Sequence, residues 1–158
     1  MDIGIYSVAV TRWVLESSLG VCPEPVSVHA EGVKAPTGVD QRAAAMLVFP
    51  KGVVSQFVCA FDGAADNALH IFGEEGCISL PHEFWQATEA VLTRADHPSE
   101  MVHAPFRING LEEEIEEATR CVRAGRTEST RMPHAETLAI IRWLDELRQQ
   151  LGVRYPFE

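Results

Sequence analysis

The sequence predicts an α+β fold: an open, mainly antiparallel β-sheet with helices on one face. Three observations predict it. Apolar residues repeat with helical spacing near both ends of the chain, they alternate or run continuously through the middle, and turn residues separate the strand-like segments. Helices and strands are therefore segregated along the chain, which is typical of α+β domains and differs from the regular alternation of a Rossmann fold.

The first predicted helix covers residues 5–17. Ile5, Val8 and Trp13 belong to a broad apolar face at helical spacing. A helix with so wide an apolar face is expected to be largely buried. Gly20 is suited to end it, because glycine readily adopts the left-handed conformation that closes many helices.

Strands are predicted next. Val26, Val28 and Ala30 alternate with polar residues, as in a strand with one covered face. Two apolar runs follow at residues 44–49 and 53–61, and a proline and a glycine lie between them. This arrangement predicts a β-hairpin.

A second hairpin is predicted from residues 69–72 and 77–80, which a turn bounded by glycines joins. Residues 87–94 and 100–104 are further strand candidates. The intervening loops are predicted at residues 32–41 and 62–67. Because each hairpin reverses the chain direction, the sheet is expected to be largely antiparallel.

Two helices are predicted in the last third of the chain. Asn109 can cap the first of them, with Glu112 as its capping-box partner, and Gly125 can end it. Its apolar stripe consists of Leu111, Ile115, Ala118 and Val122. The acidic run at residues 112–117 is interpreted as a solvated face that also places negative charge near a helix start.

The second of these helices is predicted to open at Pro133 and to stop at Gly152. Its side chains expected to be buried are Ile140, Leu144, Leu147 and Leu151.

The composition limits the classes of protein to which this chain can belong. The chain has 158 residues, enough for one domain, and we interpret residues 1–158 as a single domain. A net charge of -10 argues against nucleic-acid binding and against an anionic membrane surface. The four cysteines lack zinc-ligand spacing, so they are interpreted as reduced and mostly buried thiols in a cytoplasmic protein.

Asp2 and Tyr6 are the best candidates for chemistry. Their four-residue spacing would place both side chains on one face of a helix. A tyrosine hydroxyl can exchange a proton with a substrate oxygen, and a carboxylate can accept a hydrogen bond from a substrate hydroxyl. On spacing alone, the plainer interpretation is that Asp2 caps the helix and that Tyr6 packs as an aromatic residue.

Motifs for nucleotide binding are missing from the sequence. No G-x-G-x-x-G follows an opening strand, and there is no P-loop. The six histidines are scattered without ligand spacing, and Arg12 is interpreted as a salt-bridge or surface residue. Phe84 and Trp85 are candidates for an interface patch.

The residues Asp2-Ile3-Gly4-Ile5-Tyr6 resemble the D-x-G-x-[YH] motif of the Gfo/Idh/MocA oxidoreductases, the glucose–fructose oxidoreductase and inositol dehydrogenase family. Residues 12–15 resemble that family's next helical residues, and residues 70–78 its I-x-G-x-x-G-x-I hairpin. Residues 133–156 resemble the closing helix of members similar to dihydrodiol dehydrogenase. The resemblance covers essentially the whole chain, with the motifs in the family's order.

The resemblance implies that this chain is the C-terminal substrate and oligomerisation domain of an oxidoreductase whose Rossmann half binds NAD or NADP. It also implies that Asp2 and Tyr6 are the catalytic residues, with Tyr6 as the proton relay. The family's partner lysine belongs to an E-K-P motif that this sequence lacks, since Lys34 and Lys51 stand in other contexts. We therefore expect no dinucleotide to bind this chain alone and interpret it as a truncated chain.

The implied substrate is a small polyol or sugar, and the implied partner is a second copy that packs through the sheet face in a homo-oligomer, preferably a dimer. Two alternatives remain open. The chain could be a non-catalytic dimerisation or binding module. It could also be a small α+β isomerase or dehydratase that uses an Asp and Tyr pair without a nucleotide.

Overall fold

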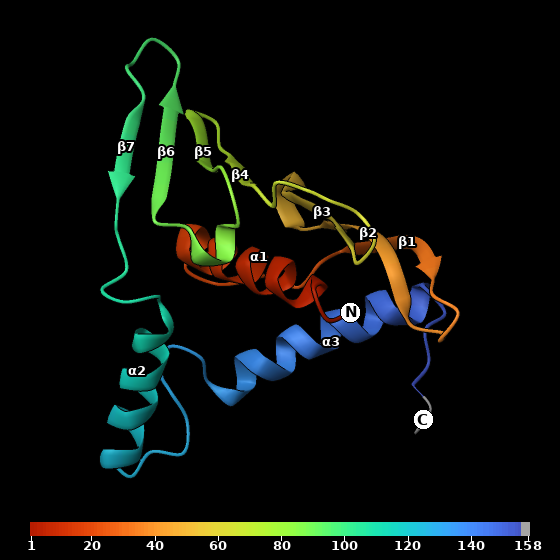
Figure 1. Ribbon diagram of the computed structural model, residues 1–158. Coiled ribbons are helices and arrows are strands. Elements are labelled where there is room, and N and C mark those ends of the chain that lie inside the picture. The colour runs from red at the N-terminus through yellow and green to blue at the C-terminus, as the bar shows by residue number, and fades with distance from the viewer. Residues whose placement is uncertain (156–158) are drawn as a thin grey trace. The chain divides into compact units, whose positions relative to one another are not determined.

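The computed structural model describes residues 1–155 and confirms the α+β class within them. Figure 1 shows the elements, which are α1 (Gly4–Leu19), β1 (Ser27–Lys34), β2 (Asp40–Val48), β3 (Val54–Ala60), β4 (Leu69–Phe72), β5 (Gly76–Leu80), β6 (Glu89–Arg94), β7 (Glu100–His103), α2 (Leu111–Arg123) and α3 (His134–Gln150). Two short 3-10 segments lie at Pro50–Gly52 and Phe84–Gln86. The chain divides into two compact units. Unit 1 comprises Met1–Ala64 and the residues from Met132 onward, and unit 2 is Ala65–Arg131.

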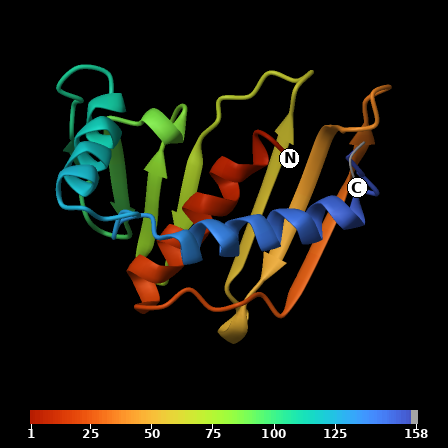
Figure 2. The ribbon, with the colours of Figure 1, turned by 90° about the horizontal axis from the view of Figure 1, so that it is seen from below.

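Unit 1 is an antiparallel sheet of order β1-β2-β3 with α1 and α3 on one face (Figure 2). In β2, Ala43, Ala45 and Leu47 are buried while the residues between them are more exposed, because alternate side chains point to opposite faces. The core also contains residues from both helices and from the ends of the strands, namely Val8, Leu15, Ala30, Phe49, Ile140, Trp143, Leu144 and Leu147. The predicted helices on one face of an open antiparallel sheet are confirmed here.

The loop predicted at residues 32–41 is wrong in its length. Strand β1 continues to Lys34 and β2 begins at Asp40. The turn is closed by hydrogen bonds from the Ala35 N–H to the Val39 carbonyl and from the Gly38 N–H to the Ala35 carbonyl, both 2.8 Å. The glycine and charged residues that suggested a loop lie on strand ends, where backbone pairing overrides their weak preference.

The expectation that the first helix is largely buried is also wrong within the described chain. Its inner residues, such as Val8 and Leu15, are buried against the sheet. The opposite side is exposed, with Tyr6 at 50 % and Trp13 at 64 % of their full exposure. The helix thus carries apolar residues on both sides but is covered on one side only.

Unit 2 contains the second hairpin in a four-stranded antiparallel sheet of order β4-β5-β6-β7. The strands of the chain therefore form two sheets, because β3 and β4 are not paired. The candidate strand at residues 87–94 begins two residues late, at Glu89, since the 3-10 segment Phe84–Gln86 precedes it. Within that segment the rings of Phe84 and Trp85 contact edge to face.

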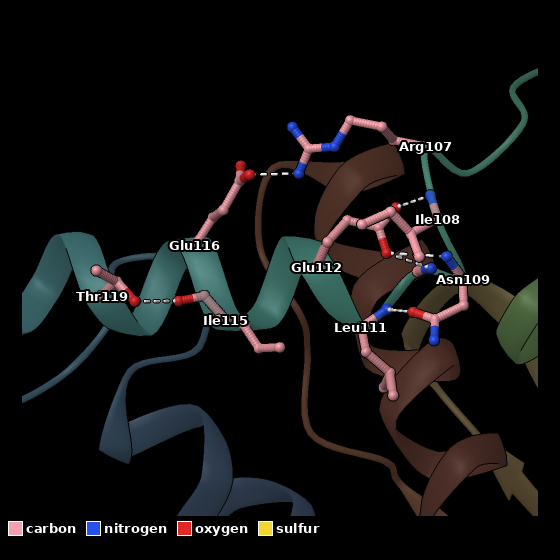
Figure 3. Close-up of polar contacts among 9 residues, drawn as sticks. Arg107, Ile108, Asn109, Leu111, Glu112, Ile115, Glu116 and Thr119 are labelled. Atoms are coloured by element: carbon pink, nitrogen blue, oxygen red, sulfur yellow. Dashed lines mark hydrogen bonds and ion pairs between the residues drawn. The ribbon is translucent and has the colours of Figure 1, made fainter.

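The start of α2 differs from the predicted capping box. Gly110, with φ of 91°, is the N-cap in place of Asn109, but both predicted partners still act at the helix start: Asn109 Oδ1 accepts a hydrogen bond from the Leu111 N–H at 3.2 Å, and Glu112 bonds the Asn109 N–H. Glu112 is buried although it was predicted to lie on a solvated face. Its carboxylate accepts hydrogen bonds from the N–H groups of Ile108 and Gly110, each 2.7 Å, and of Asn109 at 3.1 Å (Figure 3). A carboxylate that satisfies three backbone donors at once explains why this glutamate is buried.

The closing helix α3 follows Pro133 as predicted. Its side chains Ile140, Leu144 and Leu147 are buried, and Leu151 is partly buried against the same core. Gly152 has a positive φ of 64° just after the helix, as expected for a stop. Pro156, the last residue of the predicted closing motif, lies outside the described residues.

Candidate functional site

Asp2 and Tyr6 lie at the beginning of α1, at its exposed side. Helix α1 starts at Gly4, so Asp2 belongs to the preceding turn, whereas Tyr6 lies in the first helical turn. The N-cap is Ile3 and no side chain caps the helix, so the interpretation of Asp2 as a cap is wrong. Both side chains are exposed, and Tyr6, at 50 % of its full exposure, does not belong to the buried core.

The turn that carries these residues is held against the sheet of unit 1. The N-terminal ammonium of Met1 donates to Asp40 Oδ1 at 2.7 Å, and both groups are buried. Gly4 is buried as well, and a Cβ there would lie 2.8 Å from the Met1 methyl and 3.8 Å from Cys59 Sγ. Burial raises the pKa of the Cys59 thiol, so this residue is a neutral packing partner. The glycine therefore allows the first turn of α1 to pack closely against Met1 and Cys59.

An exposed apolar face continues along α1 from this point. Tyr6, Val10 and Trp13 are spaced by four and three residues, which places them on one side of the helix. Tyr6 and Trp13 are at least half exposed. The proposed relay residue therefore lies at one end of an apolar surface that the described residues leave uncovered.

The other side of α1 carries a buried ion pair between Arg12 and Glu136. The sequence analysis identified only Arg12 as a salt-bridge residue. Arg12 Nε and Nη2 donate to the two oxygens of Glu136 at 2.5 and 2.9 Å. The guanidinium also lies over the ring of Trp143, 4.5 Å from its centre. Its hydrogen bond to Glu136 raises the pKa of Arg12 and lowers that of Glu136, so both are charged. Arg12 was expected to form a salt bridge, but 124 residues separate the partners, and no local spacing could identify Glu136.

The helix start at Gly110 does not fit a dinucleotide phosphate. A pyrophosphate is usually bound by free N–H groups at a glycine-rich helix start. Gly110 precedes α2, but the Glu112 carboxylate already bonds the backbone there and would repel a phosphate. Lys34 donates to the Gly152 carbonyl at 3.1 Å, and Lys51 lies in the hairpin turn. Residues 1–155 also contain no group of three or more acidic, histidine or cysteine side chains that could hold a metal ion.

Comparison with known proteins assigns the fold to a family. The GFO/IDH/MocA C-terminal domain matches residues 1–79, half of the chain. The chain belongs to the GFO/IDH/MocA family. The hairpin motif at residues 70–78 and the motif around Tyr6 both lie within the matched range.

Curated relatives extend the similarity to the rest of the chain. The trans-1,2-dihydrobenzene-1,2-diol dehydrogenase of Danio rerio is 32 % identical over 160 residues, which are 98 % of this chain and 46 % of the relative. The chain thus spans about half the length of the curated relatives it matches, and corresponds to their C-terminal half. The GFO/IDH/MocA family consists of NAD(P)-dependent oxidoreductases.

Solved structures agree on the fold. A UDP-N-acetylglucosamine 3-dehydrogenase from Acidithiobacillus ferrooxidans superposes with a TM-score of 0.75 at 22 % identity, covering 96 % of this chain and 46 % of that one. A 3-ketoreductase from Actinomadura kijaniata in complex with NADP and TDP-benzene gives 0.70 at 20 % identity, covering 95 % and 45 %. None of the described helices is long and apolar enough to cross a lipid bilayer.

Proposed function

We propose that this GFO/IDH/MocA chain is the substrate-side half of an NAD(P)-dependent oxidoreductase acting on a secondary alcohol, or the matching carbonyl, of a sugar, cyclitol or diol. The observation that carries the proposal is the exposed Asp2 and Tyr6 pair beside an uncovered apolar helix face. The relatives support this substrate class, since one is a dehydrogenase of a dihydrobenzene diol and another of a sugar nucleotide.

In this proposal each residue has a distinct task. The ionised Tyr6 oxygen takes a proton from the substrate hydroxyl during oxidation, and the neutral Tyr6 hydroxyl returns it during carbonyl reduction. Asp2 accepts a hydrogen bond from a neighbouring substrate hydroxyl, which would favour diols and polyols. A dinucleotide held by residues outside this chain would accept the substrate hydride in oxidation and supply it in reduction, and a lysine there would favour the tyrosine's ionised form.

The exposed face of α1 supports a second domain in this position. A helix that is apolar all round is normally covered on both sides. In this chain the sheet covers one side, while Trp13 and Tyr6 remain open on the other. A nucleotide-binding domain packed there would cover Trp13 and bring its cofactor toward Tyr6. Residues 1–158 are then the C-terminal substrate and oligomerisation domain of a two-domain protein.

Tyr6→Phe in the chain joined to a nucleotide-binding half tests the proton relay. The variant removes one hydroxyl, and we expect turnover of a true substrate to fall about 100-fold or more, as general acid–base groups contribute factors of this order. The matched control is Tyr155→Phe, because Tyr155 lies over Arg148 rather than near α1. Unchanged turnover in Tyr6→Phe would remove the residue from the mechanism.

Titration of the present chain with NADH and NADPH tests the division of labour. We expect no tight binding of either dinucleotide, because Gly110, the glycine that caps a helix start within residues 1–155, faces the Glu112 carboxylate. Tight binding by this chain alone would contradict the proposal that the cofactor site lies elsewhere.

The second candidate function is a non-catalytic dimerisation module, which the open face of the unit 1 sheet favours. That face carries exposed Val54 and Val58 together with Met46. A shallow hollow of about 580 Å³ lies on it, lined in part by His29 and Gln56. A second copy would cover these apolar side chains and complete a homodimer. The same sheet-face contact would also form the homodimer of the proposed two-domain enzyme.

Sedimentation of the Val58→Asp variant tests this sheet-face dimer. A charge at the centre of an apolar interface is strongly disfavoured, so we expect a dimeric chain to become monomeric. Glu31→Asp, on the edge strand β1 of the same face, is the control that keeps the charge. A wild-type chain that sediments as a monomer at high concentration would contradict the module.

All four cysteines are free thiols, which is compatible with the cytoplasmic location that we propose.

A further inference from the structure

The first residues of strand β2 contain a β-bulge. Val33 of β1 pairs with Arg42, and the next residue of β1, Lys34, pairs with Asp40. Gln41 is therefore an extra residue on β2, without a partner of its own on β1. A bulge of this kind bends the strand and redirects the side chains beside it, and bulges are over-represented next to active sites.

The bulge turns Asp40 toward the helices of unit 1. Side chains of an uninterrupted strand alternate between its faces, so Asp40 would share the exposed face of Arg42 and Ala44. The extra residue reverses this alternation, and Asp40 is buried, as Ala43 is. Only 7 % of the Asp40 side chain is exposed. Strand β2 thus carries a carboxylate into the face that α1 and α3 cover.

The Asp40 carboxylate has one hydrogen-bonding partner within residues 1–155, the backbone nitrogen of Met1. This nitrogen lies 2.7 Å from Asp40 Oδ1. It is an ammonium in the present chain, and in a chain joined to a nucleotide-binding half it would be a peptide N–H, which donates to a carboxylate as well. Burial of a carboxylate is unfavourable unless it accepts hydrogen bonds, so the position of Asp40 depends on this backbone donor.

The start of α1 has no anchor of its own. Ile3 is the N-cap, no side chain caps the helix, and the first turn contains no acidic residue. The Tyr6 N–H reaches the Ile3 carbonyl at 3.3 Å, which is long for a hydrogen bond. The contacts that hold this turn to unit 1 are therefore the hydrogen bond to Asp40 and the burial of the Met1 side chain in the core.

We propose that Asp40 is a positioning residue for Asp2 and Tyr6. The inference rests on the proposed function, because it gives Asp40 a task in the same site. Asp40 fixes the backbone one residue before Asp2, and the bulge at Gln41 directs the carboxylate to this turn. Because Asp40 is buried, it acts through the turn rather than on a substrate. It limits the positions of the Tyr6 hydroxyl, which must lie within hydrogen-bonding distance of the substrate oxygen to exchange a proton.

Hydrogen exchange of the Tyr6 amide in the present chain tests the anchor. Asp40→Ala removes the acceptor, and we expect this amide to exchange about tenfold faster, because a charge-assisted hydrogen bond no longer holds the turn. Glu136→Gln, which loosens the same helix at Arg12, is the matched control and should leave this local exchange unchanged. Unchanged exchange in Asp40→Ala would show that packing of Met1 alone holds the turn. Equal acceleration in both variants would show a general loosening of α1, and either result overturns the proposal.

Turnover of the chain joined to a nucleotide-binding half tests whether Asp40 acts through Tyr6. Asp40→Ala should lower kcat about tenfold or more, since small displacements of a catalytic group slow the reaction strongly. In the Tyr6→Phe background the same substitution should have little further effect, because the group that Asp40 positions is already missing. Asp40→Asn should recover most of kcat, since its amide oxygen still accepts a peptide N–H. Losses that multiply in the double variant, or no recovery in Asp40→Asn, would contradict the positioning role.

The two measurements separate this inference from the proposed function. If Tyr6→Phe lowers turnover and Asp40→Ala does not, the proton relay stands and the positioning role of Asp40 fails. If Tyr6→Phe leaves turnover unchanged, the proposed function fails and the positioning role fails with it. The exchange of the Tyr6 amide still reports in that case whether Asp40 holds the turn.

Discussion

Glu112 makes unit 2 sensitive to acid. Burial raises the pKa of its carboxyl, but the N–H groups of Asn109, Ile108 and Gly110 outweigh this effect and lower the pKa to about 2 from an ordinary 4.5. A group whose pKa is lower in the folded chain stabilises the fold above its unfolded pKa, and this stabilisation is lost as the pH falls toward the folded value. The window for Glu112 is therefore about pH 5 to 2.

Glu112→Gln should lower the thermal stability of unit 2 at pH 7 and flatten its acid dependence, because the amide is uncharged throughout. Melts followed by circular dichroism between pH 7 and pH 3 measure both effects. Glu113→Gln is the control, since Glu113 is exposed and has no ionic partner among the described residues. Glu117, whose pKa is also lowered to about 2 by Ser129 and Arg120, should preserve part of the slope in every variant. A steep, unchanged acid transition in Glu112→Gln would contradict this role of the carboxylate.

The Arg12 and Glu136 pair should contribute more to the stability of unit 1 than any surface pair. Glu136→Gln leaves a buried guanidinium without its counter-charge, and we expect a loss of roughly 3 kcal/mol in the free energy of unfolding. The value lies at the low end of the usual range because Glu136 is partly exposed. Asp62→Asn, which breaks the exposed pair with Arg42, should cost much less, because solvent screens that pair. Urea unfolding of both variants measures the difference, and similar losses would contradict the distinction.

At the scale of elements, the second hairpin depends on one of its two turn glycines. A Cβ on Gly76 would lie 2.3 Å from the Thr93 carbonyl oxygen of the neighbouring strand, whereas on Gly73 the nearest atom would be 3.7 Å away. Gly76→Ala must therefore push β5 and β6 apart, and we expect a loss of about 2 kcal/mol or more. Gly73→Ala should change stability by less than about 1 kcal/mol. Thermal melts of the two variants measure these losses. A small loss in both variants would contradict the packing role of Gly76.

Elements with a strong local signal could be predicted from the sequence. The two hairpins follow from apolar runs separated by turn residues, and α3 follows from its regular stripe after Pro133. The loop at residues 32–41 was predicted too long, since the end of β1 is set by pairing with β2, which no local pattern reports. Glu112 was predicted to be solvated because its buried position depends on the three backbone donors of a turn with positive φ at Gly110.

Only the identity of the candidate site residues could be predicted, from their motif and their spacing in the sequence. Asp2 and Tyr6 could be singled out from the motif, and their exposure is a property of the fold. The broad apolar face of α1 predicted a largely buried helix, and the side that bears Trp13 is nevertheless open. A hydrophobic pattern specifies that a face prefers to be covered, but it does not identify the segment, domain or second copy that covers it.

The buried apolar side chains of the described molecule are distributed unequally between its two units. Nearly all buried apolar side chains, including Leu47, Phe49 and Leu147, belong to unit 1, whereas Cys121 is the only one among the described residues of unit 2. Buried apolar area provides most of the free energy that opposes unfolding. Unit 2 should therefore open before unit 1, and a single unfolding transition should not describe this chain.

Native-state hydrogen exchange measures this difference strand by strand. The central strand β2, paired on both sides, should exchange only through global unfolding of unit 1. The amides of β5 and β6 are equally well paired but lack a core behind them, so they should exchange with a lower opening free energy. Equal opening free energies for β2 and β5 would show that pairing alone, without buried apolar area, sets the stability of these sheets.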